Sequence, residues 1–193
     1  MPERKPGGQR QDPRERLIEL LPNLRAFALS LCRNSALADD LVQDTVLKAW
    51  SNFDKFDPDT RLEAWLFTIL RNTFYSNLRK SRREVGDSDG IHAATLYTKP
   101  AHDGRLAYND FQRAFDQLSP EHREVLVLVG ASGYSCEEAA KMMGVAIGTV
   151  KSRASRARKR LADLMGLADG EEVLSSSDGA TSAVISRSAI AAA

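Results

Sequence analysis

The side chains with the most distinctive chemistry lie in one basic segment near the C-terminal end of the chain. No acidic residue interrupts the run from Gly148 to Ala162. At about 100° per residue of a helix, the apolar and small side chains of this segment share one side. They are Val150, Ala154, Ala157, Leu161 and Leu164. The opposite side collects Lys151, Ser152, Ser155, Arg156, Arg158 and Lys159, with Arg153 and Arg160 at its borders.

Such a cationic helix face predicts a polyanionic partner. A solvated face normally mixes signs, because like charges close together on a helix cost about 0.2–0.5 kcal/mol per pair. DNA phosphates offset that cost through the release of counterions. We expect Arg153 or Arg156 to contact guanine, with the two serines permitting close approach to base edges. Lys159 and Arg160 lie further along, where phosphate contacts are expected. A merely solvated face is the alternative.

The residues before this segment have the spacing of a helix-turn-helix motif. Ala140 allows two helices to cross closely, Gly144 suits the turn, and Val150 packs the second helix back onto the first. Ser135 and Glu138 have capping-box spacing at the start of the first helix. A plain three-helix bundle shows similar spacing. If the motif reads DNA, the first turn of the basic helix enters the major groove.

A helix expected from Ala36 to Trp50 has two unlike faces. Its buried side contains Ala38, Leu41, Val42, Thr45, Val46 and Ala49. Its far side contains Asp40, Gln43, Asp44, Leu47 and Trp50. Tryptophan is enriched among the anchors of protein interfaces, so the far side predicts a protein-docking face with acidic surroundings. The alternative for Trp50 is a place in the core, folded over the following loop.

The next expected helix begins near Thr60, which has capping-box spacing with Glu63. One stripe of this helix contains Arg61, Thr68, Asn72, Tyr75 and Arg79, with Trp65 at its edge. Arginine, amide and aromatic groups together suit unstacked bases and their phosphates. The preceding loop adds Phe53, Lys55 and Phe56. Its phenylalanines either stack against bases or close the end of the helical bundle.

Helical periodicity through most of the chain predicts an all-α fold. We expect two small helical domains, at 12–83 and 105–167. The segment 84–104 contains scattered Gly, Pro and Asp and predicts a flexible linker. Residues 1–11 and 168–193 contain few large apolar side chains and are expected to be disordered.

Composition excludes several classes of protein. The net charge of +1 over 193 residues gives no indication of nucleic acid, so that argument rests on where the charges lie. Cys32 and Cys136 lack the paired spacing of metal ligands and predict small buried residues in a reducing compartment. His92, His102 and His122 are scattered, and neither an enzyme nor a cofactor is expected. No membrane span or signal peptide is recognisable, so a cytoplasmic protein is expected.

Five segments resemble one known family, the sigma factors of bacterial RNA polymerase. The segment from Asp40 to Trp50 resembles the polymerase-binding part of sigma region 2, and Trp65 to Asn72 resembles the helix that reads the −10 element. The segments Leu118 to Val125, Gly133 to Ala140 and Gly148 to Arg153 resemble region 4. Their joint occurrence in this order, with no third module between them, resembles the extracytoplasmic-function group.

The resemblance implies a division of labour between the two domains. Region 4 would bind the −35 element as duplex and touch the polymerase flap, through Thr149, Lys151, Ser152, Arg153, Ser155, Arg156, Lys159 and Arg160. Region 2 would hold the melted −10 non-template strand through Phe56, Asp59, Thr60, Arg61, Asn72 and Arg79. It would dock on the clamp coiled coil of core RNA polymerase through Asp40, Gln43, Asp44, Leu47 and Trp50.

Overall similarity is greatest to the EcfG-type general-stress subgroup of alphaproteobacteria. This resemblance implies sequestration by a small NepR-type anti-sigma factor. The main alternative is a sigma-like decoy that binds an anti-sigma factor without recognising a promoter. A decoy does not need the cationic helix that this chain retains. A dimeric helix-turn-helix repressor would need a dimerisation element, and no long heptad run supplies one.

Overall fold

The computed structural model describes residues 13–84 and 103–167, and its regular elements in these ranges are all helical. The N-terminal module consists of α1 (Pro13–Glu19), α2 (Leu21–Cys32), α3 (Ser35–Ser51), the short 3-10 turn η1 (Phe53–Lys55) and α4 (Leu62–Glu84). The C-terminal module consists of α5 (Asp103–Asp116), α6 (Pro120–Val125), the π-helical turn η2 (Leu126–Ala131), α7 (Cys136–Met143) and α8 (Ile147–Met165). The predicted all-α class is confirmed.

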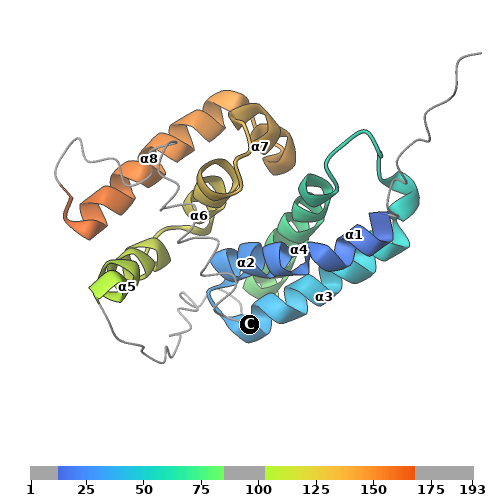
Figure 1. Cartoon of the computed structure of the whole chain (residues 1–193), viewed down its shortest axis with the longest axis horizontal. Helices are drawn as coiled ribbons and strands as arrows, with labels where there is room; N and C mark the ends of the chain where they lie inside the picture. The colour runs from blue at the N-terminus through green and yellow to red at the C-terminus, as the bar shows by residue number, and fades with distance from the viewer. Residues whose placement is uncertain (1–12, 85–102, 168–193) are drawn as a thin grey trace, which may run out of the picture.

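Several predicted segments lie outside the described residues. They are the N-terminal segment 1–11, nearly all of the linker 84–104, and the tail 168–193. His92 and His102 fall there as well. Figure 1 shows the two modules side by side, with α6 between α8 and α2.

The first helical stretch consists of two helices, α1 and α2. The chain breaks at Leu20, and Pro22 lies in the first turn of α2. A proline ring collides with the carbonyl four residues earlier, here that of Ile18, so the helix cannot pass through this point. The apolar residues Leu24, Phe27 and Leu31 of α2 are buried.

The predicted capping box at Thr60 and Glu63 is wrong. Helix α4 begins at Leu62, and the Thr60 hydroxyl instead donates to the carbonyl oxygen of Asp57 at 2.7 Å. Glu63 lies inside the first turn, and its carboxylate accepts from Asn23 Nδ2 at 2.8 Å and from the hydroxyl of Tyr134 at 3.0 Å. The side chain is therefore engaged in tertiary contacts rather than in capping.

The capping signals of the C-terminal module are confirmed. Ser135 Oγ accepts from the amide of Glu138 at 3.1 Å, and the Glu138 carboxylate accepts from the amide of Ser135 at 2.8 Å. Gly144 ends α7 with φ of 65°, a left-handed conformation that suits glycine. The turn therefore sets α8 against α7, as the helix-turn-helix spacing predicts.

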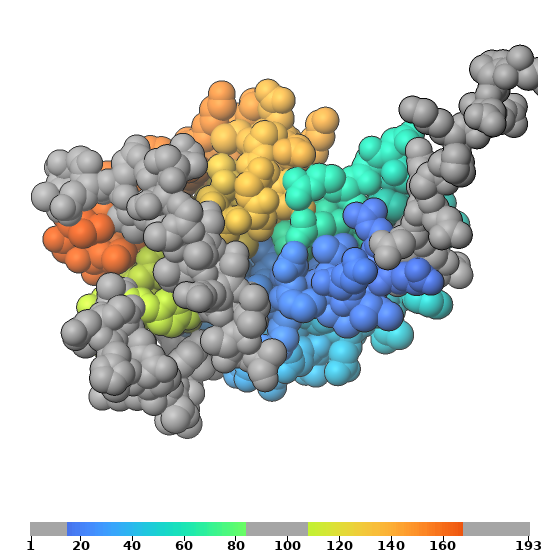
Figure 2. Space-filling view, viewed as in Figure 1, coloured from blue at the N-terminus to red at the C-terminus, as the bar shows by residue number. Residues whose placement is uncertain are grey.

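The two modules share one continuous core. Helices α2, α3 and α4 pack together, and the rings of Phe27 and Phe67 stack with centroids 4.5 Å apart. Across the module boundary, α2 contacts α6 and α4 contacts α7. The Phe67 ring meets that of Tyr134 edge-on at 6.1 Å. Figure 2 shows the surfaces of the two modules meeting in the middle of the molecule.

Candidate nucleic-acid interface

Helix α8 presents the cationic face that the sequence predicts. Its apolar side is buried through Val150, Ala154, Ala157 and Leu161. Its opposite side is exposed through Lys151, Ser152, Ser155, Arg156, Arg158, Lys159 and Arg160, whereas Thr149 and Arg153 are half-buried at the margin. The face therefore combines long cationic side chains with small ones over most of the helix length.

One arginine of α8, Arg156, is held in a defined position by contacts with the preceding turn of the helix. Arg156 Nε donates to the carbonyl oxygen of Ser152 at 3.2 Å, and Nη2 lies 3.3 Å from Ser152 Oγ. Ser152 Oγ in turn donates to the carbonyl oxygen of Thr149 at 3.1 Å. These contacts hold the guanidinium along the helix surface, next to the small side chain of Ser152.

His122 of α6 lies within the electrostatic reach of α8. Burial and the positive charges of Arg156 and Arg153 lower the pKa of this imidazole, while Glu121 acts in the opposite direction. The uncharged form of this imidazole is therefore favoured beside the cationic helix. The sequence places His122 in a region 4 motif but gives no indication of this proximity.

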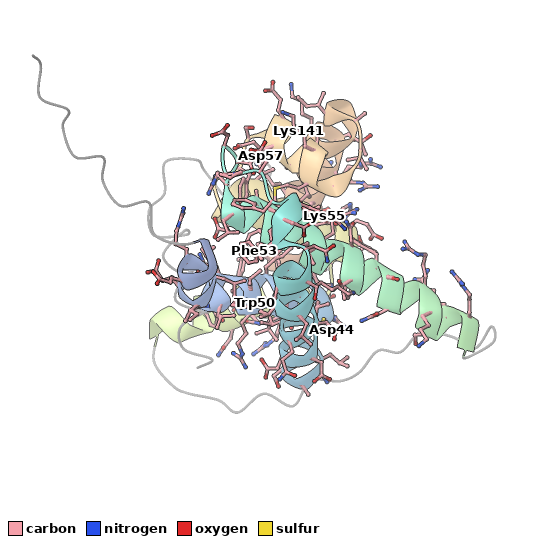
Figure 3. All side chains as sticks on the ribbon, turned by 90° about the vertical axis from the view of Figure 1, so that its right-hand side faces the viewer. Asp44, Trp50, Phe53, Lys55, Asp57 and Lys141 are labelled. Atoms are coloured by element: carbon pink, nitrogen blue, oxygen red, sulfur yellow. The ribbon has the colours of Figure 1, made fainter. Side chains whose placement is uncertain are left out.

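The far side of α3 is exposed as predicted. Asp40, Gln43 and Asp44 are exposed, and the apolar Leu47 and Trp50 retain 67% and 56% of their accessible surface. The Trp50 ring meets the edge of the Phe53 ring, at 6.4 Å between centroids. Figure 3 shows Asp44 and Trp50 on one helix, with Phe53 in the turn that follows. The alternative that Trp50 is a core residue is therefore wrong.

The residues predicted to bind the −10 strand have different surroundings. Phe56 is half-buried at the end of the bundle, with the centre of its ring 5.3 Å from that of Trp65 and 6.2 Å from that of Phe53. Asp59 and Thr60 are exposed in the turn before α4. The other three are exposed on α4 or immediately before it: Arg61, Asn72 and Arg79.

An open pocket of about 440 Å³ lies between the end of α3 and α4. Its lining consists of Lys48, Asn52, Lys55, Trp65, Ile69, Asn72, Thr73 and Ser76. Lys48 Nζ donates to Thr73 Oγ1 at 2.9 Å, so one ammonium group is fixed in the wall. The sequence predicts Asn72 and Trp65 near nucleic acid but misses Lys48, Asn52 and Ser76, because only tertiary packing brings α3 and α4 together here.

A buried ionic cluster joins α4 to α6. The carboxylate of Glu124, fully buried, accepts from Arg71 Nε at 2.5 Å and from the hydroxyl of Tyr75 at 2.8 Å. Burial raises the pKa of Glu124, and Arg71 opposes that rise. Burial and the neighbouring Glu124 both raise the pKa of Tyr75. Tyr75, predicted on the nucleic-acid stripe, is thus bound by the C-terminal module.

A buried cation, Arg123, also stabilises the module boundary. Arg123 donates from Nε to the carbonyl oxygen of Ser30 at 2.6 Å, from Nη2 to that of Leu31 at 2.9 Å, and from Nη1 to that of Leu118. In the reverse direction, Arg33 donates to the carbonyl oxygen of Asp116. Burial lowers the pKa of Arg123 to about 10, so it remains charged at neutral pH.

The described residues contain no group of three or more His, Cys, Asp or Glu side chains that could hold a metal ion. Cys32 and Cys136 are free and half-buried. Burial raises the pKa of the Cys32 thiol to about 11. Among the same residues, no helix is long and apolar enough to cross a membrane.

Comparison with known proteins assigns the chain to a family. Residues 17–84 match the model of sigma-70 region 2, and residues 108–161 match that of sigma-70 region 4. The chain is 51% identical over 159 residues to the ECF RNA polymerase sigma factor EcfG of Rhodopseudomonas palustris. The aligned region covers 82% of this chain and 87% of that protein. The chain belongs to the extracytoplasmic-function sigma factors. This sigma factor is therefore a transcription initiation factor that binds core RNA polymerase and promoter DNA, and not an enzyme.

Further relatives support the same assignment. The sigma factor is 32% identical over 146 residues to CarQ of Myxococcus xanthus, with 75% of this chain and 84% of that protein covered. Among solved structures it is similar to the sigma factor RpoE in complex with the anti-sigma factor NepR from Bartonella quintana. That similarity has a TM-score of 0.70 and 52% identity, and covers 79% of this chain and 95% of the other.

Proposed function

We propose that this sigma factor reads the −35 element with the exposed face of α8. The uninterrupted cationic surface of that helix is the observation on which the proposal depends. The proposed contacts are Thr149, Lys151, Ser152, Arg153, Ser155, Arg156, Lys159 and Arg160. Arg156, which is held beside Ser152, is suited to base contact, whereas Lys159 and Arg160 are suited to phosphate.

The melted −10 strand is proposed to lie along the exposed edge of α4 and the turn before it. The proposed contacts are Phe56, Asp59, Thr60, Arg61, Asn72 and Arg79. The pocket between α3 and α4 supports this placement. It offers an indole for stacking, an amide for hydrogen bonding and two lysines for phosphate. An unstacked base of the non-template strand is its proposed occupant.

The far side of α3 is proposed to dock on the clamp coiled coil of the polymerase, and the C-terminal module on the flap. The docking residues are Asp40, Gln43, Asp44, Leu47 and Trp50. Two large exposed apolar side chains within a carboxylate-bearing surface support the proposal, because apolar anchors with a polar rim are typical of protein interfaces.

A NepR-type anti-sigma factor is the proposed regulatory partner, and stress-response genes are the proposed targets. The support is likeness to EcfG and to an RpoE solved with NepR. The proposed place of action is the cytoplasm, where core polymerase and promoters are found. We also propose that 12–83 and 105–167 are the working domains and that 84–104 links them.

Reconstitution with core RNA polymerase tests the proposal directly. The purified chain is mixed with core enzyme and genomic fragments, and the bound promoters are mapped by transcription and footprinting. Protection of duplex near −35 together with strand opening near −10 is expected. A chain that binds a NepR-type protein but never forms holoenzyme would be the decoy instead. The absence of any opened promoter would overturn the proposal.

A further inference from the structure

One stripe of α4 faces the C-terminal module rather than solvent. Its members follow at intervals of four residues: Glu63, Phe67, Arg71 and Tyr75. The first two contact Tyr134, and the last two contact Glu124. This stripe lies directly beside the exposed edge proposed to hold the −10 strand, since Arg71 Nη1 lies 3.4 Å from Asn72 Oδ1.

The observed arrangement cannot serve both promoter elements at once. Positions −10 and −35 lie about 25 base pairs apart, which at 3.4 Å per base pair is about 85 Å of duplex. In the structure, Arg71 of the −10-binding helix touches Glu124, whose helix α6 packs against α8. The modules must therefore separate when the sigma factor occupies a promoter, and the Glu124 contacts must break.

Separation leaves a ready-made oxyanion site on α4. Arg71 and Tyr75 both donate to one carboxylate, and the guanidinium carbon of Arg71 lies 4.8 Å from the centre of the Tyr75 ring. Both donors belong to the same helix, so the pair survives when α6 leaves. A phosphate offers oxygens that can accept the same two hydrogen bonds, and arginine binds phosphate and carboxylate with similar geometry.

Building on the proposed function, we propose that Arg71 and Tyr75 bind a phosphate of the −10 strand and that Glu124 occupies this site in the closed chain. Glu124 thus acts as an internal competitor for promoter DNA. Its full burial, and the use of both carboxylate oxygens by groups of the other module, support this role over that of a surface ion pair.

The two partners of this contact have opposite expected effects when mutated. Glu124→Gln removes the charge of the competitor but retains its shape. We expect small-angle X-ray scattering to show a more extended free chain, and the free chain to bind a −10 non-template oligonucleotide about 3- to 10-fold more tightly. In holoenzyme, where the modules are already apart, the same variant should bind the oligonucleotide as the wild type does.

Arg71→Ala should also extend the free chain, but it should weaken oligonucleotide binding by holoenzyme about 10-fold. Tyr75→Phe, which removes one hydroxyl, should act in the same directions with smaller effect and provides a test if a Glu124 variant fails to fold. Arg82→Ala, an exposed cation in the last turn of α4, is the matched control. The oligonucleotide is taken from a promoter that the wild-type holoenzyme opens.

Unchanged binding by Arg71→Ala and Tyr75→Phe holoenzymes would show that the contact is structural only and would overturn the phosphate site. Unchanged binding by a folded Glu124→Gln free chain would overturn the competition. In both cases a wild-type holoenzyme that opens promoters leaves the proposed function standing. A wild-type holoenzyme that opens none contradicts the proposed function itself.

Discussion

Arg123 of the C-terminal module donates to the carbonyl oxygen of Leu31 at 2.9 Å, so a side chain from one module completes the final turn of a helix in the other. The last carbonyls of a helix lack partners within the helix and favour cations. Arg123 supplies α2 with both a hydrogen-bond donor and a positive charge. Arg33 supplies the same to the end of α5, at the carbonyl oxygen of Asp116. The modules are therefore joined by reciprocal capping as well as by apolar packing.

Replacing Arg123 should destabilise the free chain. Arg123→Ala leaves the carbonyls of Ser30 and Leu31 without their charged donor, and hydrogen bonds to charged groups contribute about 1.5–3 kcal/mol each. We expect a loss of about 2–4 kcal/mol in the free energy of unfolding by urea. The exposed Arg113 provides the control substitution. Equal stability of the two variants would contradict the capping role.

Reversing charge on α8 should abolish −35-dependent transcription. Arg153→Glu combined with Arg156→Glu places two carboxylates where phosphates and guanine edges are expected. Polymerase affinity should stay near the wild-type value, because α3 is unchanged. Run-off transcription and a core-binding assay separate the two effects. Retained promoter selectivity in a folded double variant would refute the assignment of α8.

Truncating the exposed apolar pair on α3 should weaken polymerase binding. Leu47→Ala or Trp50→Ala removes an interface anchor, for which a loss of about 1–3 kcal/mol in binding free energy is typical. Stability should change little, since both side chains are more than half exposed. Ile18→Ala, at an equally exposed site on α1, is the control. Wild-type affinity in the Leu47 and Trp50 variants would move the docking surface elsewhere.

The capping box of α7 should contribute stability that depends on pH. Ser135→Ala should cost about 1 kcal/mol, as the loss of an N-cap usually does. Hydrogen bonds from the Ser135 backbone and side chain lower the pKa of Glu138, so its contribution is present above the ordinary carboxyl pKa and is lost as pH falls through the lowered value. The difference in Tm between Glu138→Gln and wild type should therefore shrink in acid. A constant difference from pH 7 to pH 3 would exclude a role for the Glu138 charge.

Local rules predict most of the fold because the relevant contacts are close in sequence. The capping box at Ser135, the left-handed Gly144 and the burial of Val150 and Leu161 all depend on neighbours within one or two turns. The same reasoning fails at Thr60, where turn geometry delays the helix start to Leu62.

The contact between the modules was not predictable in this way. Arg123 and Glu124 are a charged pair in a short helix, a pattern that normally indicates solvent exposure. Their partners lie far away in sequence, 53 residues in the case of Arg71 and 92 in that of Leu31. The available signal was their position immediately before the apolar run that starts at Val125. Because α6 is short and continues into this buried run, Arg123 and Glu124 were candidates for burial with it.

The shared core has a calorimetric consequence. Separation of the modules exposes the rings of Phe67 and Tyr134 to solvent, together with the charged groups of Arg123 and Glu124. Exposed apolar surface raises the heat capacity, and the apolar part of the attraction weakens on cooling. Binding of this sigma factor to the polymerase should therefore show a less negative heat-capacity change than docking without module separation would give. In the free protein, cooling should weaken the contact between the modules before either module unfolds.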